Sequence, residues 1–170
     1  MNYENLLVWN VRGLNCRARR NVVRNLAGEQ RASLVSLQET KLDSCSDSIV
    51  RDMLGLDFDY FALPASHTCG GILLAWRTDV WSITNPLIRS NNLTAKVTLL
   101  HNGDTWWWTS VYGPQGDHEK LLFLDELREV RGLCPDTWLV WGCKIRAYSM
   151  DWNVVPRAQG TTAACLYSAD

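Results

Sequence analysis

Short apolar runs separated by turn residues recur along most of the chain, and this pattern predicts a fold rich in β-strands. The first run, residues 6–9, ends at Asn10 and is followed by turn residues at Gly13 and Asn15. Residues 93–100 alternate between apolar and polar side chains, as expected for a strand with one buried face. Its inward side chains are expected to be Leu93, Ala95, Val97 and Leu99. Further strands are predicted at residues 34–37, 58–63, 72–76, 80–84, 105–111 and 137–141.

Three segments are predicted to be helical, two of them from apolar residues repeated with a helical period. Residues 16–29 place arginines on one side and end near Gly28. The apolar side of this helix carries Val22, Val23 and Leu26. Residues 47–54 form the shortest helix, and residues 117–130 form an amphipathic one with Asp117 as the expected N-cap. The buried stripe of that last helix is expected to be Leu121, Leu122, Leu124, Leu127 and Val130.

The order of these elements favours an α/β fold, with either one mixed sheet or a sandwich of two sheets. After Gly142 the pattern stops, because residues 143–170 show neither a helical nor a strand period. We therefore predict a structured unit over residues 1–142 and a divergent tail without clear structure over residues 143–170.

Composition indicates one globular domain. The chain has 170 residues, of which 46% are hydrophobic and 21% charged, and its formal net charge is −1. The chain as a whole is therefore not a basic nucleic-acid binder. Residues 4–31, however, hold six arginines and two glutamates, and such local charge can attract phosphate groups. The candidates for phosphate binding are Arg12, Arg17, Arg19 and Arg20, and the alternative is a solvated helix face.

The six cysteines and the N-terminal segment bear on the cellular compartment. No cysteine pair has C-x-x-C spacing, which argues against a zinc site and for free thiols. No basic stretch followed by an apolar run begins the chain, and no run approaches the ~18 apolar residues of a membrane span. We expect an intracellular protein of the nucleus or cytoplasm, neither secreted nor membrane-bound.

Polar residues end three of the predicted strands, each directly before a turn. They are Asn10, Glu39 and Tyr112. Taken singly, each has an ordinary explanation: a turn asparagine, a surface glutamate and a core tyrosine. Ligands of α/β sheets often bind beyond strand ends, and magnesium needs only one or two protein oxygens because it keeps several waters. The three together therefore indicate a cation and phosphate site.

Five segments in order resemble the nuclease domain of plant-type LINE (non-LTR) retrotransposons, within the endonuclease/exonuclease/phosphatase superfamily. They are residues 7–15, 37–41, 70–76, 111–114 and 138–142. The resemblance implies a four-layer α/β sandwich that cuts phosphodiester bonds with Mg²⁺ or Mn²⁺. It also implies DNA as the partner, with RNA as another possible substrate, and a reverse transcriptase domain in the parent polyprotein. By the same resemblance Glu39 is the metal carboxylate, Asn10 helps to hold the metal or phosphate, and Tyr112 lies against the scissile phosphate.

The sequence departs from this pattern after Gly142. The family continues with Gly-Asp-Phe-Asn, whose Asp acts on the attacking water, but Cys143 follows here. No histidine follows His118, so the family's terminal histidine has no counterpart either. An insertion could have displaced the motif to Asp151 and Asn153.

We therefore expect residues 1–142 to be the N-terminal part of a nuclease-like domain, truncated or decayed, incomplete at the C-terminus and weakly active or inactive. The alternatives are a non-catalytic nucleic-acid-binding or structural remnant, and another phosphatase or exonuclease of the same superfamily.

Overall fold

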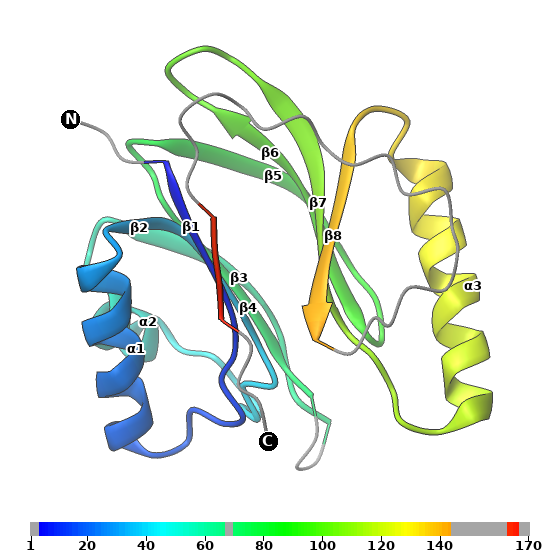
Figure 1. Ribbon diagram of the computed structural model, residues 1–170, viewed down its shortest axis with the longest axis horizontal. Coiled ribbons are helices and arrows are strands. Elements are labelled where there is room, and N and C mark those ends of the chain that lie inside the picture. Colours follow the sequence, from blue (N-terminus) through cyan, green and yellow to red (C-terminus); the bar gives the residue numbers. More distant parts are fainter. Residues whose placement is uncertain (1–3, 67–69, 144–162, 167–170) are drawn as a thin grey trace.

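Two β-sheets lie face to face with helices on both outer surfaces, in the computed structural model that describes residues 4–66, 70–143 and 163–166 (Figure 1). The elements are β1 (Asn5–Asn10), α1 (Arg17–Glu29), β2 (Ala32–Gln38), α2 (Asp47–Leu54), β3 (Phe58–Leu63), β4 (Ile72–Arg77), β5 (Trp81–Ile88), β6 (Asn92–Leu99), β7 (Thr105–Tyr112), α3 (Asp117–Leu133), β8 (Trp138–Cys143) and β9 (Ala163–Leu166). The strand order is β3-β4-β2-β1-β9 in the first sheet and β5-β6-β7-β8 in the second. The expectation of a four-layer α/β sandwich is confirmed.

The first sheet begins with a parallel pair. β1 and β2 are joined through α1 and pair in parallel, whereas β4 is antiparallel to both β2 and β3. Alternate side chains of these strands, such as Leu7 and Val35, pack against Val23 of α1 and Met53 of α2, and all four are buried. This packing places both helices on the outer face of the first sheet, as Figure 1 shows.

The two sheets share an aromatic and aliphatic core. Val8 and Leu74 of the first sheet pack in the same cluster as Trp81, Val97 and Trp108 of the second, and each is 5% exposed or less. The inward residues predicted for β6 are all buried here, which confirms the predicted buried face of that strand. Since each buried large side chain contributes about 1.5–3 kcal/mol, this layer is a main source of stability.

A chain of hydrogen bonds ties α3 to the outer face of the second sheet. Trp138 Nε1 donates to Thr109 Oγ1 (2.8 Å), which lies 2.7 Å from Thr94 Oγ1. Thr94 Oγ1 donates to Asn92 Oδ1 (3.2 Å), and Asn92 Nδ2 donates to Glu126 Oε1 of α3 (2.6 Å). Each hydroxyl therefore donates one bond and accepts another, with the Glu126 carboxylate as the final acceptor.

Two expectations for the helices were wrong in detail. Gly116, not Asp117, is the N-cap of α3, and Asp117 is the first helical residue. Leu121 and Leu122 are 63% and 57% exposed, and the buried stripe is Phe123, Leu127 and Val130. A stripe with spacing of four and three residues fits a narrow contact with one sheet face, which leaves the other leucines in solvent.

Val22 of α1 is likewise 53% exposed, while Val23 and Ala27 are buried.

None of the described helices is long and apolar enough to cross a membrane.

Two strand assignments also differ. β5 runs on to Ile88, past a register shift between Thr84 and Leu87 that accommodates Pro86. Proline is tolerated there because β5 is an edge strand with an irregular ladder. In addition, β9 forms parallel to β1 within the segment where no strand was predicted. The remainder of residues 144–170 lies outside the described part of the chain.

Replacing Thr109 by valine should lower the free energy of unfolding by about 1–3 kcal/mol, because the indole N–H of Trp138 loses its acceptor. Chemical denaturation measures the change. Thr105→Val, at an exposed threonine of the same strand, should change stability by no more than about 0.5 kcal/mol. Equal losses in the two variants would show that the buried chain of hydrogen bonds makes no specific contribution to stability.

Candidate active site

The carboxyl ends of β1, β2 and β7 meet at one edge of the sandwich, the lower edge in Figure 1. Asn10 ends β1 directly opposite Gln38, which ends β2. Glu39 follows Gln38, and Tyr112 ends β7 of the other sheet. Tyr112 Oη donates to Glu39 Oε1 across the two sheets at 3.4 Å. The structure thus brings together the three strand-end residues that the sequence singled out.

A buried polar chain lies directly beneath this contact. Ser36 Oγ of β2 and Ser110 Oγ of β7 are 2.6 Å apart, which joins the two sheets. Gln38 Nε2 donates to Ser36 Oγ (3.0 Å), and Trp108 Nε1 donates to Ser110 Oγ (2.8 Å). All four residues are 1% exposed or less. Because strand side chains alternate, Gln38 and Tyr112 point into the same layer as the two serines.

Glu39 reaches Tyr112 through an unusual backbone conformation. Its φ is +58°, in the left-handed region that residues other than glycine seldom adopt. Continued strand geometry would turn this side chain to the helix side of the sheet, as it does for Leu37. Arg12 and Lys41, in neighbouring turns, also have positive φ angles of 52° and 56°. Each such residue costs about 1–3 kcal/mol, and such strain gathers at functional sites.

Backbone hydrogen bonds hold these turns together. Val11 N donates to Gln38 O (3.0 Å), and Leu14 N donates to Thr40 O (2.8 Å). Thr40 N and Lys41 N donate to the carbonyls of Gly71 (3.2 Å) and Gly70 (2.9 Å). The turn that carries Glu39 is therefore fixed on both sides, by the segments that follow β1 and precede β4.

Two glycines with positive φ angles precede β4, and Gly71 makes this close approach possible. Gly71 has a φ of +90°, and a Cβ there would collide with Thr40 Oγ1 and lie 3.2 Å from Lys41 N. Gly70 has a φ of +79°, and a Cβ there would lie 3.5 Å from the ring of Tyr112. The glycine pair thus shapes the surfaces beside Glu39 and Tyr112.

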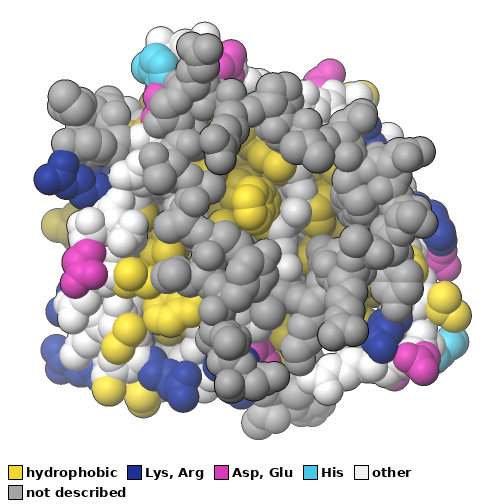
Figure 2. Space-filling model, viewed as in Figure 1, with side chains coloured by type: hydrophobic (Ala, Val, Ile, Leu, Met, Phe, Trp, Pro, Cys, Tyr) yellow, Lys and Arg dark blue, Asp and Glu magenta, His cyan; other side chains and the backbone are white. Residues whose placement is uncertain are grey.

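Two arginines of the N-terminal segment donate hydrogen bonds to the backbone beside the site, and their expected role in phosphate binding stays a prediction. Arg19 Nη1 donates to Val11 O (3.2 Å), and Arg20 Nη1 donates to Leu14 O (2.8 Å). Both guanidinium groups therefore brace the turn after β1. Arg17 and Arg12 are exposed. Figure 2 shows positively charged side chains spaced over α1, so the surface next to the site retains basic character.

The side chains present suit a hard divalent cation that keeps most of its waters. Glu39 supplies a half-buried carboxylate, with the Tyr112 hydroxyl and the Asn10 carboxamide as further oxygens. Asn10 Oδ1 accepts a hydrogen bond from Arg12 N (3.2 Å), which holds the carboxamide in place. Within the described residues no group of three or more His, Cys, Asp or Glu side chains is placed to hold a metal ion. A cage made entirely of protein ligands is therefore absent there, whereas Mg²⁺ is commonly held by one or two carboxylates and water.

The remaining predicted site residues, Asp151 and Asn153, lie outside the described residues. Sequence reasoning missed the pair Ser36 and Ser110. The signal that could have found each of them is a serine among the inward positions of a buried strand.

Comparison with known proteins was made on sequence and on structure. The sequence matches no protein-family profile and no curated protein. Solved structures do match, each over 81% of this chain. An endonuclease/exonuclease/phosphatase family protein from Bacteroides thetaiotaomicron superposes with a TM-score of 0.58 at 12% identity, over 60% of its length. TDP2 from D. rerio, complexed with a single-strand DNA product, gives 0.60 at 17% identity, over 58% of its length.

This chain has the endonuclease/exonuclease/phosphatase fold. The mannosyl-6-phosphatase of B. thetaiotaomicron shares it with a TM-score of 0.59 at 12% identity, over 63% of its own length. The chain thus spans about three fifths of the length of these structures. The similarity confirms the expected superfamily fold, and the retrotransposon origin stays a prediction.

Gly71→Ala should lower the free energy of unfolding by about 2–4 kcal/mol, because the new Cβ adds a collision to the strain of a positive φ. Gly103→Ala is the matched control, since Gly103 has a φ of +78° but open space around its Cβ position. Strain alone should lower its stability by about 1 kcal/mol. If denaturant unfolding gave equal losses for both, the packing of Gly71 on the Glu39 turn would be unsupported.

Proposed function

We propose that the chain is a phosphodiesterase domain that nicks DNA slowly with Mg²⁺ or Mn²⁺. The observation that carries the proposal is the contact between the Glu39 carboxylate and the Tyr112 hydroxyl at the shared edge of the sandwich. The strained turn at Glu39 supports it, because the conformation directs a carboxylate to an edge where it serves no evident packing purpose.

We assign the following roles to residues of the site. Glu39 would hold the cation, with the Asn10 carboxamide beside it. When bound, the cation would act as a Lewis acid toward a phosphoryl oxygen. Tyr112 is placed to donate a hydrogen bond from its hydroxyl, which lies 3.4 Å from Glu39 Oε1. Arg12 and Arg17 are exposed near the strand ends and would attract the phosphate backbone.

Slow rather than efficient turnover is proposed because no general base has been assigned. A general base contributes ~10²–10⁴-fold in rate. Asp151, with Asn153, is the candidate for this role, and it stands eight positions after Cys143, which occupies the place of the family's Asp.

DNA is the proposed substrate because TDP2, which shares the fold, is known in complex with a DNA product. RNA is a further candidate on the same chemistry. A phosphatase acting on a phosphorylated sugar is the second candidate function, favoured by the mannosyl-6-phosphatase of the same fold. A non-catalytic nucleic-acid-binding remnant is the third.

We also propose that the domain derives from a LINE retrotransposon, with a reverse transcriptase domain in the parent polyprotein and an intracellular location. The five motif segments support this origin. Sequencing the genomic DNA downstream of codon 142 tests it. A Gly-Asp-Phe-Asn reading in another frame is the expected result, and its absence from all frames would count against the proposal.

Purified chain should convert supercoiled plasmid to the nicked form slowly with Mg²⁺ and not with EDTA. Glu39→Gln should reduce the Mg²⁺-dependent rate by at least ~10²-fold, because the cation loses its charged ligand. Glu29→Gln, at an exposed glutamate that ends α1, should leave the rate unchanged.

Three outcomes separate the candidates. Nicking that survives Glu39→Gln would contradict the proposed role of Glu39. Release of phosphate from mannose 6-phosphate without any nicking would favour the phosphatase. Plasmid binding without either reaction would favour the remnant.

A further inference from the structure

A second cavity lies at the end of the first sheet opposite Glu39. It has a volume of about 630 Å³ and opens between the C-terminal parts of α1 and α2, beside the start of β2 and the end of β4. Ala32 at the start of β2 lines it, whereas Glu39 follows the other end of that strand. At about 3.3 Å per residue, the strand separates the two places by roughly 20 Å. The cavity is therefore distinct from the candidate active site.

Arginines from four parts of the chain line this cavity. They are Arg24, Arg31, Arg51 and Arg77, and Asp52 is the one acidic residue among the lining residues. The side chains of Asp57 and Asp79 act on Arg77 from outside the lining. The lining residues themselves thus carry four guanidinium groups and one carboxylate.

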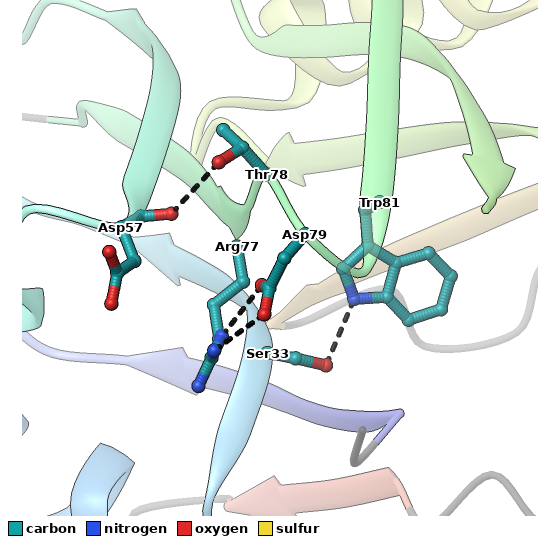
Figure 3. Close-up of polar contacts among 6 residues, drawn as sticks. All are labelled: Ser33, Asp57, Arg77, Thr78, Asp79 and Trp81. Carbon is teal, nitrogen blue, oxygen red and sulfur yellow. Dashed lines mark hydrogen bonds and ion pairs between the residues drawn. The ribbon is translucent and has the colours of Figure 1, made fainter. Parts of the chain in front are cut away.

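Arg24 and Arg77 each pair with an aspartate. Arg24 Nη2 pairs with Asp52 Oδ1 at 2.6 Å. Arg77 donates from Nε and Nη2 to the two carboxylate oxygens of Asp79 (2.9 and 2.7 Å), a bidentate pair that Figure 3 shows. Arg51 is exposed, and among the described contacts its guanidinium has no hydrogen bond or ion pair. Its planar group of donors is thus available to an oxyanion.

The walls of the cavity are largely apolar. They are formed by Ala27, Ala32, Met53, Leu54, Phe58 and Val80. The Ser33 hydroxyl, also in the lining, accepts a hydrogen bond from Trp81 Nε1 (2.9 Å) and is 1% exposed, so it is already satisfied (Figure 3). An arginine rim over apolar walls suits a ligand with an anionic head and an apolar body. Cavities that bind small molecules have volumes of about 300–1,000 Å³.

We propose that this cavity binds a small organic phosphate, with the phosphate on Arg51 at the rim and an apolar or aromatic body against Phe58 and Leu54. The site is independent of Glu39, so it stands whether or not the chain cuts DNA. Its ligand class includes nucleoside monophosphates, which match the volume and carry both required parts.

Isothermal titration calorimetry of the whole chain in EDTA tests the proposal. The probes are adenosine monophosphate, adenosine and inorganic phosphate. EDTA removes any contribution from a cation at Glu39. Adenosine monophosphate should bind more tightly than either of its parts alone. Arg51→Gln should weaken that binding about 10- to 100-fold, because a charge-assisted hydrogen bond is lost. Arg17→Gln, at an exposed arginine of α1 outside the cavity lining, should not change it.

Several results would overturn the proposal. Adenosine monophosphate could fail to bind at millimolar concentration, or adenosine could bind equally well. Equal affinity for inorganic phosphate and adenosine monophosphate would show that the apolar part of the ligand contributes nothing to binding. Equal weakening by Arg17→Gln and Arg51→Gln would show general charge attraction instead of a site. If Arg51→Gln lowered only the melting temperature and left binding unchanged, Arg51 would stabilise the fold around α2 and would not bind the ligand.

Discussion

The hydrogen bond between Ser36 and Ser110 is the contact on which the geometry of the site depends. It crosses the layer between the two sheets, and both hydroxyls are fully buried. A buried hydroxyl without a partner costs about 1–3 kcal/mol, so the two sheets are stabilised in the register that brings the serines together. In that register the next inward positions are Gln38 and Tyr112. The chemistry at the edge is thus aligned by a polar contact inside the core.

The backbone strain of the structure is concentrated in the turns beside these aligned strand ends. Glu39, Arg12 and Lys41 all adopt left-handed backbone conformations in adjoining turns. Backbone hydrogen bonds from the turn that carries Glu39 to the carbonyls of Gly70 and Gly71 hold that turn in place. Conformations of this kind persist only when the surroundings determine them strongly. The sandwich therefore acts as a rigid frame for one carboxylate and one phenol.

Local periodicity predicted the helices and nearly all the strands, because burial of one face is recorded directly in the sequence. It failed where burial depends on distant partners. Leu121 and Leu122 were assigned to the buried stripe, but the sheet contacts only the side of α3 that carries Phe123. The pairing of β9 with β1 is equally non-local. Strand ends and motif order predicted that Asn10, Glu39 and Tyr112 would lie at one edge, and the structure places them there. The serine pair was not found, since a hydroxyl in a strand does not reveal its partner 74 positions away.

Binding of Mn²⁺, followed by electron paramagnetic resonance, tests most directly whether the aligned strand ends form a cation site. The intact chain should bind one Mn²⁺ that Mg²⁺ displaces. Glu39→Gln should weaken this binding at least about 10-fold, as loss of a ligand or of its support does in other metal sites. Glu29→Gln should bind Mn²⁺ like the unaltered chain. Equal Mn²⁺ affinity in the unaltered chain and in Glu39→Gln would contradict the central claim, because the carboxylate brought to Tyr112 would then hold no cation.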